Sequence, residues 1–251
     1  MIKISVITGT RAEYSLLKPL IKLFHLSSDF ELQLIVTGMH LSPEFGLTIN
    51  EILNDDLPII RKVENLLSSD SSIGISKSIA LGIISFSEIF DNLKPDLILI
   101  LGDRFEIFSA ACAAMAGCFP LAHIHGGEAT EGLIDEAIRH SITKMSHYHF
   151  VSTEEYKKRV IQLGEQPCRV FNVGALGIEN IKKTKFLEKN ELELELDFKF
   201  AERNLLITFH PETLEPERCE IHMNNLLKAL KKLKNTNLIF TYPNADTSGR
   251  K

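Results

Sequence analysis

The sequence predicts a doubly wound α/β domain with a mostly parallel sheet, followed by the start of a second α/β unit. Short apolar runs, several closed by glycine, alternate with helical apolar spacing from the N-terminus to about residue 174. One run, within residues 95–103, is apolar without interruption, which is typical of a parallel strand covered on both faces. The alternation restarts at residue 204, after a charged stretch. This rhythm indicates helices packed on both faces of a sheet.

Six strands are expected in the first domain. Residues 3–9 form an apolar run that ends at Gly9, and residues 31–38 form a second run that also ends in glycine. Residues 95–103 supply the third strand. The remaining strands are expected at residues 119–127, 148–152 and 169–174.

Five helices are expected between these strands. Residues 15–24 place apolar side chains three and four positions apart, and Pro19 falls in the first turns, where proline is tolerated. The last helix, residues 152–164, opens with Ser152 and Glu155 at capping-box spacing. The other helices are expected at residues 75–93, 104–117 and 134–145.

The pattern places the domain boundaries near residues 177 and 203. Residues 1–177 form the first, Rossmann-like domain. Residues 178–203 are charged and rich in Glu, Leu and Lys, and we interpret them as a linker helix region. Residues 204–251 begin a second Rossmann-like, nucleotide-binding domain, and they are too few for an independent α/β domain of ordinary size.

The composition is that of a soluble globular protein. Of 251 residues, 44% are hydrophobic and 24% are charged, and the formal net charge is −5. No basic block favours nucleic acid, and no export signal or membrane-spanning run is apparent. The 4 cysteines form no CxxC pair. We therefore expect a cytoplasmic protein that binds neither nucleic acid nor a membrane.

Polar residues follow four of the predicted strands, in the stretches TGTRAEYS, TGMH, GDRFE and HIHGGE. The carboxyl ends of parallel strands share one edge of the sheet, and ligands bind in the crevice beyond that edge. These stretches are far apart in the sequence, but the fold gathers them. Their convergence predicts a functional site.

Two of these stretches each allow two interpretations. Residues 9–15 are either a phosphate site at a helix N-terminus, to which Arg11 and Ser15 would contribute, or simply a capped helix start. Asp103 either faces the crevice as a reactive carboxylate or caps the following helix. Both pairs of interpretations are about equally favoured by pattern alone.

The stretch HIHGGE allows a metal site, which the pattern does not favour. His123 and His125 alternate on a strand, so their side chains are expected on one face. Hydrolases that bind metal through such a pair usually have a barrel fold, and the order of strands and helices in this sequence is not that of a barrel. We expect no metal.

An acid–base site is the alternative for the same stretch. Asp135, at the start of a helix, would meet Glu128 and His125 around a substrate. The plain alternative is a solvated helix face with the pairs Asp135–Arg139 and Glu136–His140.

Residues 204–251 repeat the arrangement of the first domain, in which polar residues follow each predicted strand. FHPET (residues 209–213) and YPNADTSGR (residues 242–250) follow its two strands. Two α/β halves whose strands end in polar residues are typical of an enzyme that binds a nucleotide sugar in a cleft. Pro, Asn, Asp and Gly are, however, also common in ordinary turns.

These motifs resemble the hydrolysing UDP-N-acetylglucosamine 2-epimerases, and among them the bacterial NeuC type that serves sialic and legionaminic acid synthesis. The resemblance is collinear and covers essentially the whole chain. It rests on TGTRAEYSLLKPL, VTGMHLSPEFG, LGDRFEIFSAA, HIHGGE, DEAIRHSITKMSH, FNVGALGIENI, FHPET and PNADTSGR.

The resemblance implies a glycosyltransferase-B-like fold and a metal- and cofactor-independent reaction. UDP would leave UDP-N-acetylglucosamine by anti-elimination across C1 and C2, and water would add to the 2-acetamidoglucal to give N-acetylmannosamine. The alternative sugar is UDP-2,4-diacetamido-2,4,6-trideoxyglucose. A homodimer is also implied.

The resemblance assigns roles residue by residue. Asp103, Glu128 and Asp135 match catalytic acids, and His125 stands where many members carry another acid. Because histidine also moves protons near neutral pH, the assignment of base and acid stays open. His40 matches a sugar-side histidine. The nucleotide-side matches are Arg11, Ser15, Arg104, His210 and Asn244.

The family runs well past PNAD, and the part beyond it holds the UDP. We therefore expect the 251-residue chain to be poorly active or inactive alone, or to be an inactive fragment.

Overall fold

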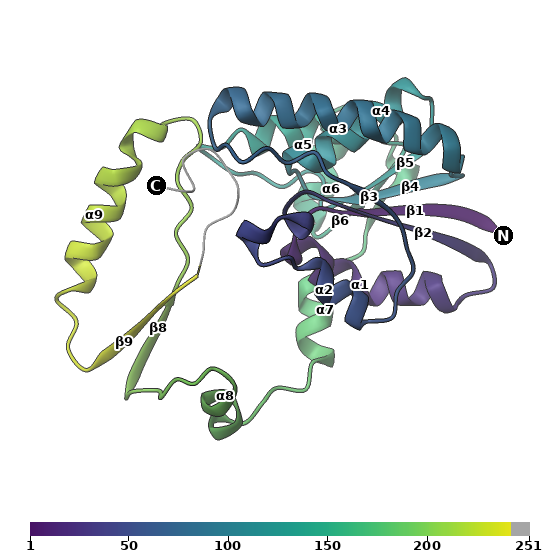
Figure 1. The fold of residues 1–251 in the computed structure, drawn as a ribbon. Helices are drawn as coiled ribbons and strands as arrows, with labels where there is room; N and C mark the ends of the chain where they lie inside the picture. The colour runs from purple at the N-terminus through teal and green to yellow at the C-terminus, as the bar shows by residue number, and fades with distance from the viewer. Residues whose placement is uncertain (242–251) are drawn as a thin grey trace. The chain divides into compact units, whose positions relative to one another are not determined.

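The computed structural model describes residues 1–241, drawn as a ribbon in Figure 1. The chain divides into two compact units, Met1–Lys182 and Lys183–Lys251. The division falls a little beyond the boundary expected at residue 177, because the helix α7 (Leu176–Lys183) begins on the first unit. Leu176 packs against its core, and Asn180 donates a hydrogen bond to the carbonyl of Ser15 at 2.8 Å.

The first unit contains a seven-stranded sheet in which every pairing is parallel, as predicted. The chain enters at the middle of the sheet, and the order is β3-β2-β1-β4-β5-β6-β7. The switch point therefore lies between β1 and β4. The strands are β1 (Ile2–Thr8), β2 (Phe30–Thr37), β3 (Ile59–Val63), β4 (Leu97–Leu101), β5 (Leu121–Ile124), β6 (Tyr148–Val151) and β7 (Val170–Asn172).

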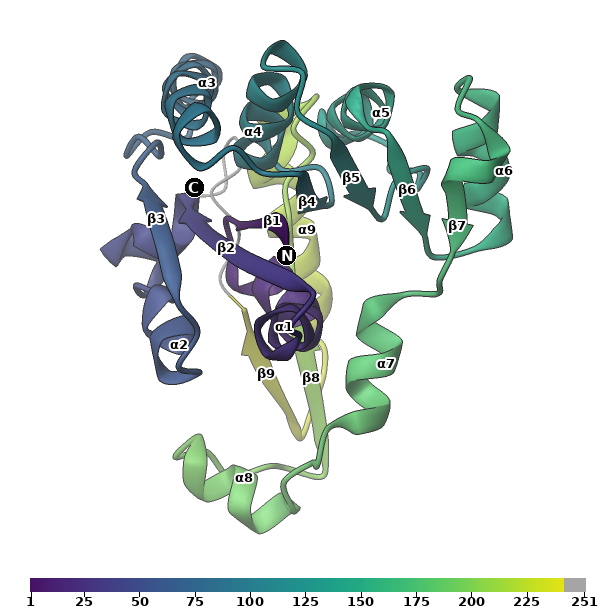
Figure 2. The ribbon, with the colours of Figure 1, turned by 90° about the vertical axis from the view of Figure 1, so that its right-hand side faces the viewer.

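Helices cover both faces of this sheet (Figure 2). Alternation along β1 sends Ile4 and Val6 to one face and Ile7 to the other, so each face carries its own apolar core. One core includes α1 (Arg11–Leu26) and α2 (Ile49–Asn54). The other includes α3 (Ser72–Leu93), α4 (Phe105–Ala116) and α5 (Asp135–Met145). A smaller core packs Val160 of α6 (Glu154–Gln162) against β6 and β7.

The sequence patterns missed β3 and α2. Only Val63 of β3 is buried, and Arg61 and Lys62 are exposed, because this strand lies at the edge of the sheet. It therefore lacks the continuous apolar run of the central strands. The helix α2 is six residues long, too short to show a helical period.

The capping box expected for α6 is wrong. Thr153 is the N-cap, and its hydroxyl accepts from the Tyr156 N–H at 3.2 Å. Ser152 lies one residue outside the helix, and its hydroxyl is therefore available to another partner. A capping box that was not predicted starts α1, where Thr10 and Glu13 bond each other's backbone N–H groups.

The helix α3 is the one helix in residues 1–241 that is long and apolar enough to cross a membrane. The packing of α3 against α4 and the sheet accounts for its apolar composition. Phe86 and Phe90 are fully buried, and α3 approaches α4 so closely at Gly82 that a Cβ there would lie 2.7 Å from Ser109.

The second unit contains α8 (Lys189–Glu195), β8 (Arg203–Ile207), α9 (Cys219–Leu230) and β9 (Thr236–Phe240). The two strands pair in parallel, as the restarted rhythm predicted. The expected linker helix is instead two short helices, α7 and α8, separated by residues 184–188. The strand pair is open to solvent, and Leu206 is 72% exposed.

Candidate active site

The carboxyl edge of the first sheet is built from sharp turns. Gly38, Gly102 and Gly127 have φ angles of 60°, 79° and 78°, which glycine adopts without strain. These turns redirect the chain directly after β2, β4 and β5. Because β1 and β4 are neighbours, the turn that starts α1 lies beside the turn that carries Asp103.

His123 and His125 do not share a face, contrary to the expectation. The strand β5 ends at Ile124, and His125 has a φ of 66°, in the left-handed region that non-glycine residues seldom adopt. The turn therefore breaks the alternation of the strand. His123 points into the core with no exposed surface, and His125 turns towards Glu128.

His123 supports the turn before Asp103. Its Nε2 lies 2.7 Å from the carbonyl of Gly102, and its Nδ1 lies 3.2 Å from the Thr143 hydroxyl. Since a carbonyl only accepts, Nε2 carries the proton. Burial lowers the pKa of His123 to about 3, so the ring is neutral. Its role is to hold the Gly102 backbone.

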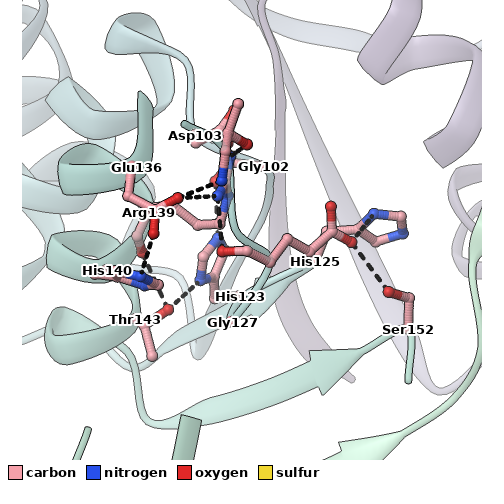
Figure 3. A network of polar contacts seen from close by, with 12 residues as sticks. Gly102, Asp103, His123, His125, Gly127, Glu136, Arg139, His140, Thr143 and Ser152 are labelled. Carbon is pink, nitrogen blue, oxygen red and sulfur yellow. Dashed lines mark hydrogen bonds and ion pairs between the residues drawn. The ribbon is translucent and has the colours of Figure 1, made fainter. Parts of the chain in front are cut away.

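Arg139 links the separate strand ends (Figure 3). The sequence allowed it to lie on a solvated helix face, but it is only 4% exposed. Its guanidinium donates to the Asp103 carboxylate and, at 2.9 Å, to the Thr130 hydroxyl. It also donates to the Glu128 carbonyl at 2.8 Å and lies 3.3 Å from the Glu136 carboxylate.

These contacts settle part of the ambiguity at Asp103. The N-cap residue of α4 is Arg104 rather than Asp103, and the helix start shows no side-chain capping hydrogen bond from it. The Asp103 carboxylate instead pairs with Arg139, and 22% of its side chain remains exposed. It therefore lies at the edge of the sheet and is partly accessible to solvent.

Glu128 lies between two hydrogen-bonding groups. Its Oε1 is 3.2 Å from Nδ1 of His125 and 3.0 Å from the Ser152 hydroxyl. Burial raises the pKa of Glu128, but the contacts with His125 and Ser152 and the charge of Arg139 outweigh burial and lower it. With 31% of its side chain exposed, Glu128 is an accessible carboxylate held in its ionised form.

Asp135 is the first residue of α5 and is half-buried. The same helix holds the expected Glu136–His140 pair at 3.2 Å. Asp135 thus begins the helix whose Arg139 contacts Asp103 and the Glu128 backbone.

The residues predicted to bind the nucleotide are not gathered in one place. Two are exposed on α1, one faces inward, and two belong to the second unit. Arg11 and Ser15 are exposed in the first turns of α1, and the Ser15 hydroxyl donates to the Arg11 carbonyl at 2.8 Å. Arg104 turns inward, with its Nε 3.3 Å from Glu106 and only 10% of its side chain exposed. His210 is exposed beyond β8 in the second unit. Asn244 lies outside the described residues.

His40 is inside the first unit rather than on its surface. It is fully buried between the hydroxyls of Thr8 and Thr48, at 3.0 and 2.7 Å, with the Tyr14 ring edge-on to it. Burial lowers its pKa to about 4, in spite of a hydrogen bond with the Thr10 backbone. The neutral ring joins β1 to the segment after β2.

Two buried acids at this edge were not singled out from the sequence. The Oε2 of Glu13 accepts from the N–H groups of Gly9 and Thr10, at 2.7 and 3.2 Å. Glu106 is fully buried nearby. Burial, and then the charge of Glu106, raise the pKa of Glu13 to about 8, against the effect of Arg104 and of the two backbone bonds. The Thr10-x-x-Glu13 spacing is a capping-box signal that could have revealed Glu13.

No group of three or more His, Cys, Asp and Glu side chains in the described part of the chain is arranged to hold a metal ion. The separation of His123 from His125 removes the pair on which a metal site would have depended.

A sequence profile of the UDP-N-acetylglucosamine 2-epimerase family matches residues 23–251. The chain belongs to this family. The match includes the turns that carry Asp103 and Glu128 and the helix that carries Arg139, and it continues into the second unit.

Curated members of the family are similar over nearly the whole chain. A GDP/UDP-N,N'-diacetylbacillosamine 2-epimerase (hydrolysing) of Campylobacter jejuni is 48% identical over 98% of this chain and 64% of its own length. A polysialic acid biosynthesis protein of Escherichia coli is 45% identical, over 98% and 63%. A UDP-N,N'-diacetylbacillosamine 2-epimerase (hydrolysing) of Legionella pneumophila is 37% identical, over 98% and 65%. The chain thus spans just under two thirds of these relatives.

Solved structures confirm the fold class. The UDP-bound MnaA of Staphylococcus aureus superposes with a TM-score of 0.77 at 19% identity, over 100% of this chain and 65% of its own. The UDP-N-acetylglucosamine-bound 2-epimerase of Neisseria meningitidis gives 0.73 at 20% identity, over 96% and 72%. The chain therefore has the glycosyltransferase-B-like α/β fold of the epimerases.

Proposed function

We propose that the protein is a hydrolysing 2-epimerase that releases UDP from a 2-acetamido UDP-sugar and inverts C2. The observation that carries the proposal is the joined set Asp103–Arg139–Glu128 at the sheet edge of a 2-epimerase family member. The Asp103 carboxylate is held by a buried guanidinium and the Glu128 carboxylate by His125 and Ser152, and both are partly open to solvent, which suits proton transfer at a sugar carbon.

The proposed reaction has two steps. A base takes the proton from C2, the C2–H electrons form the C1=C2 bond, and the C1–O bond breaks so that UDP leaves as an anion. Water then adds across the double bond, with its oxygen at C1 and a proton at the opposite face of C2. The products are UDP and the free 2-epimeric sugar.

Glu128 is our candidate for the base. Its lowered pKa keeps the carboxylate ionised at neutral pH, and its exposed part allows contact with a substrate. The other proposed catalytic residues are Asp103, Asp135 and His125. In this proposal they donate and accept the protons of the elimination and of the addition of water. No metal or cofactor takes part in either step as written.

The diphosphate is proposed to bind at the N-terminus of α1. The helix dipole favours anions there, and the exposed Arg11 adds a positive charge. His210 and Asn244 would serve the nucleotide from the second unit. The inward-facing Arg104 acts in this proposal through Glu106 and the turn, rather than by direct contact.

The identity of the sugar is proposed from the relatives. The Campylobacter and Legionella proteins, at 48% and 37% identity, are both named for N,N'-diacetylbacillosamine, a 2,4-diacetamido sugar. This favours UDP-2,4-diacetamido-2,4,6-trideoxyglucose. UDP-N-acetylglucosamine is the second candidate, because the 45% identical relative serves polysialic acid synthesis. A cytoplasmic homodimer is proposed as the working state.

The proposal is tested by UDP release from the two nucleotide sugars. The assay uses this chain and a version continued by the C-terminal part of the Campylobacter relative, since the chain spans 64% of that protein. We expect a higher kcat/KM for the diacetamido sugar. A preference for UDP-N-acetylglucosamine would contradict the substrate choice, and no UDP release by either version from either sugar would contradict the function.

A further inference from the structure

Ser152 contacts Glu128, although Ser152 follows β6 and Glu128 lies in the turn after β5. Ser152 also precedes the Thr153 N-cap of α6. Its hydroxyl donates to Glu128 Oε1 at 3.0 Å, and His125 approaches the same oxygen at 3.2 Å (Figure 3). Both contacts therefore fall on one carboxylate oxygen, and neither engages Oε2.

The backbone next to Glu128 is fixed by the same helix. Gly127 lies so close to α6 that a Cβ would be 2.5 Å from the Tyr156 carbonyl and 2.8 Å from Val160. Arg159 of α6 donates to the Gly127 carbonyl. The turn is therefore pressed against α6, and Ser152 at the start of this helix reaches the carboxylate of the next residue.

We infer that Ser152 is a positioning residue that fixes the Glu128 carboxylate through Oε1 and leaves Oε2 to meet the substrate. The inference rests on the proposed function only for the identity of that substrate. A carboxylate with two donors on one oxygen has a defined orientation, and defined orientation is a large part of catalytic efficiency. Loss of Ser152 should therefore reduce kcat more than it changes KM.

Several charged or titratable groups lie around Glu128 and its backbone, and all of them remain when Ser152 is replaced. They are His125 at the end of β5, Arg139 on α5, and Arg159, with its partner Glu155, on α6. Burial raises the pKa of Glu128, and Ser152 is one of the groups that oppose it. Removal of the hydroxyl alone should therefore move the protonation midpoint of Glu128 to higher pH.

The test is a carbon-13 NMR titration of the Glu128 side-chain carboxyl in the 251-residue chain labelled with δ-carbon-13 glutamate. The Glu128 signal is assigned from its loss in Glu128→Gln. Ser152→Ala is compared with Ser152→Thr, which keeps a hydroxyl. The matched control is Thr153→Ala, which removes the neighbouring N-cap bond to Tyr156 but no contact with Glu128.

We expect a higher midpoint in Ser152→Ala with little change in Tm, and a midpoint close to the original in Ser152→Thr. Thr153→Ala should lower Tm and leave the midpoint unchanged. An unchanged midpoint in Ser152→Ala, or an equal rise in Thr153→Ala, would overturn the inference.

This readout separates the inference from the proposed function. If neither UDP-sugar is turned over while the midpoint moves in Ser152→Ala alone, the function is wrong and the positioning role holds. If UDP is released but Ser152→Ala keeps both the midpoint and kcat of the original chain, the positioning role is wrong and the function holds.

Discussion

His125 shows how one residue's backbone decides its chemistry. Its φ of 66° removes it from the strand pattern and places Nδ1 on Glu128. The residue types around Glu128 were predicted from HIHGGE and from the family resemblance. The contact itself was not predictable, because a left-handed histidine at a strand end has no signature in the sequence. The burial of Arg139 was hidden for a similar reason, since an Asp/Arg spacing of four also describes a solvated helix.

Replacement of His125 should shift the pH dependence of UDP release. After burial, which raises the pKa of Glu128, His125 is the largest influence, and it lowers that pKa. His125→Ala should therefore raise the pKa, and His125→Glu should raise it further by adding a second negative charge. Because a base acts when ionised, the acidic limb of the kcat/KM profile should move to higher pH in that order, with the alkaline limb unaffected by this group.

The control is His140→Ala, which breaks a histidine–carboxylate pair with Glu136 instead. It should leave the acidic limb in place. An acidic limb that stays put in both His125 variants would mean that Glu128 is not the base.

At the scale of elements, the turn from β1 into α1 depends on a buried acid. Glu13 holds the N–H groups of Gly9 and Thr10, and its pKa of about 8 keeps it protonated at neutral pH. Between the unfolded value of 4.5 and about 8, the folded chain binds one more proton at this site than the unfolded chain. The contribution of Glu13 to stability is thus complete below pH 4.5 and is lost as the pH rises through about 8.

Glu13→Gln should remove this pH dependence. The amide oxygen can accept the same two backbone bonds, and no charge develops as the pH rises. We expect the free energy of unfolding of Glu13→Gln to exceed that of the original chain at pH 8 and to match it closely at pH 5. Urea denaturation at the two pH values measures this, with Glu44→Gln, on the segment after β2, as a control for the loss of a carboxylate elsewhere. A parallel decline of Glu13→Gln and the original chain between pH 5 and pH 8 would contradict the account.

Elements with a strong apolar period were predictable, and marginal ones were not. The six predicted strands of the first sheet and its five long helices are present, because central parallel strands and the helices that cover them must be apolar. The edge strand β3 and the short α2 escaped notice because they bury few residues. Ser152 was misassigned as an N-cap because Ser152 and Thr153 both suit that position, and only the backbone conformation decides between them.

For the molecule as a whole, all the candidate catalytic residues lie in the unit Met1–Lys182. Both large apolar cores also lie in this unit. The second unit supplies an open parallel strand pair and His210. The break between α7 and α8 could not be predicted from a stretch whose composition suits one helix.

The most direct test of the central claim is turnover in D2O followed by NMR, with the chain continued by the C-terminal part of the Campylobacter relative. Elimination and hydration place a solvent proton on C2, so the account predicts deuterium at C2 of the released 2-epimeric sugar. Glu128→Gln should lower the rate by roughly a hundredfold or more, as expected for loss of a general base. Release of UDP with protium retained at C2, or with the sugar's original configuration, would show direct hydrolysis and contradict the account.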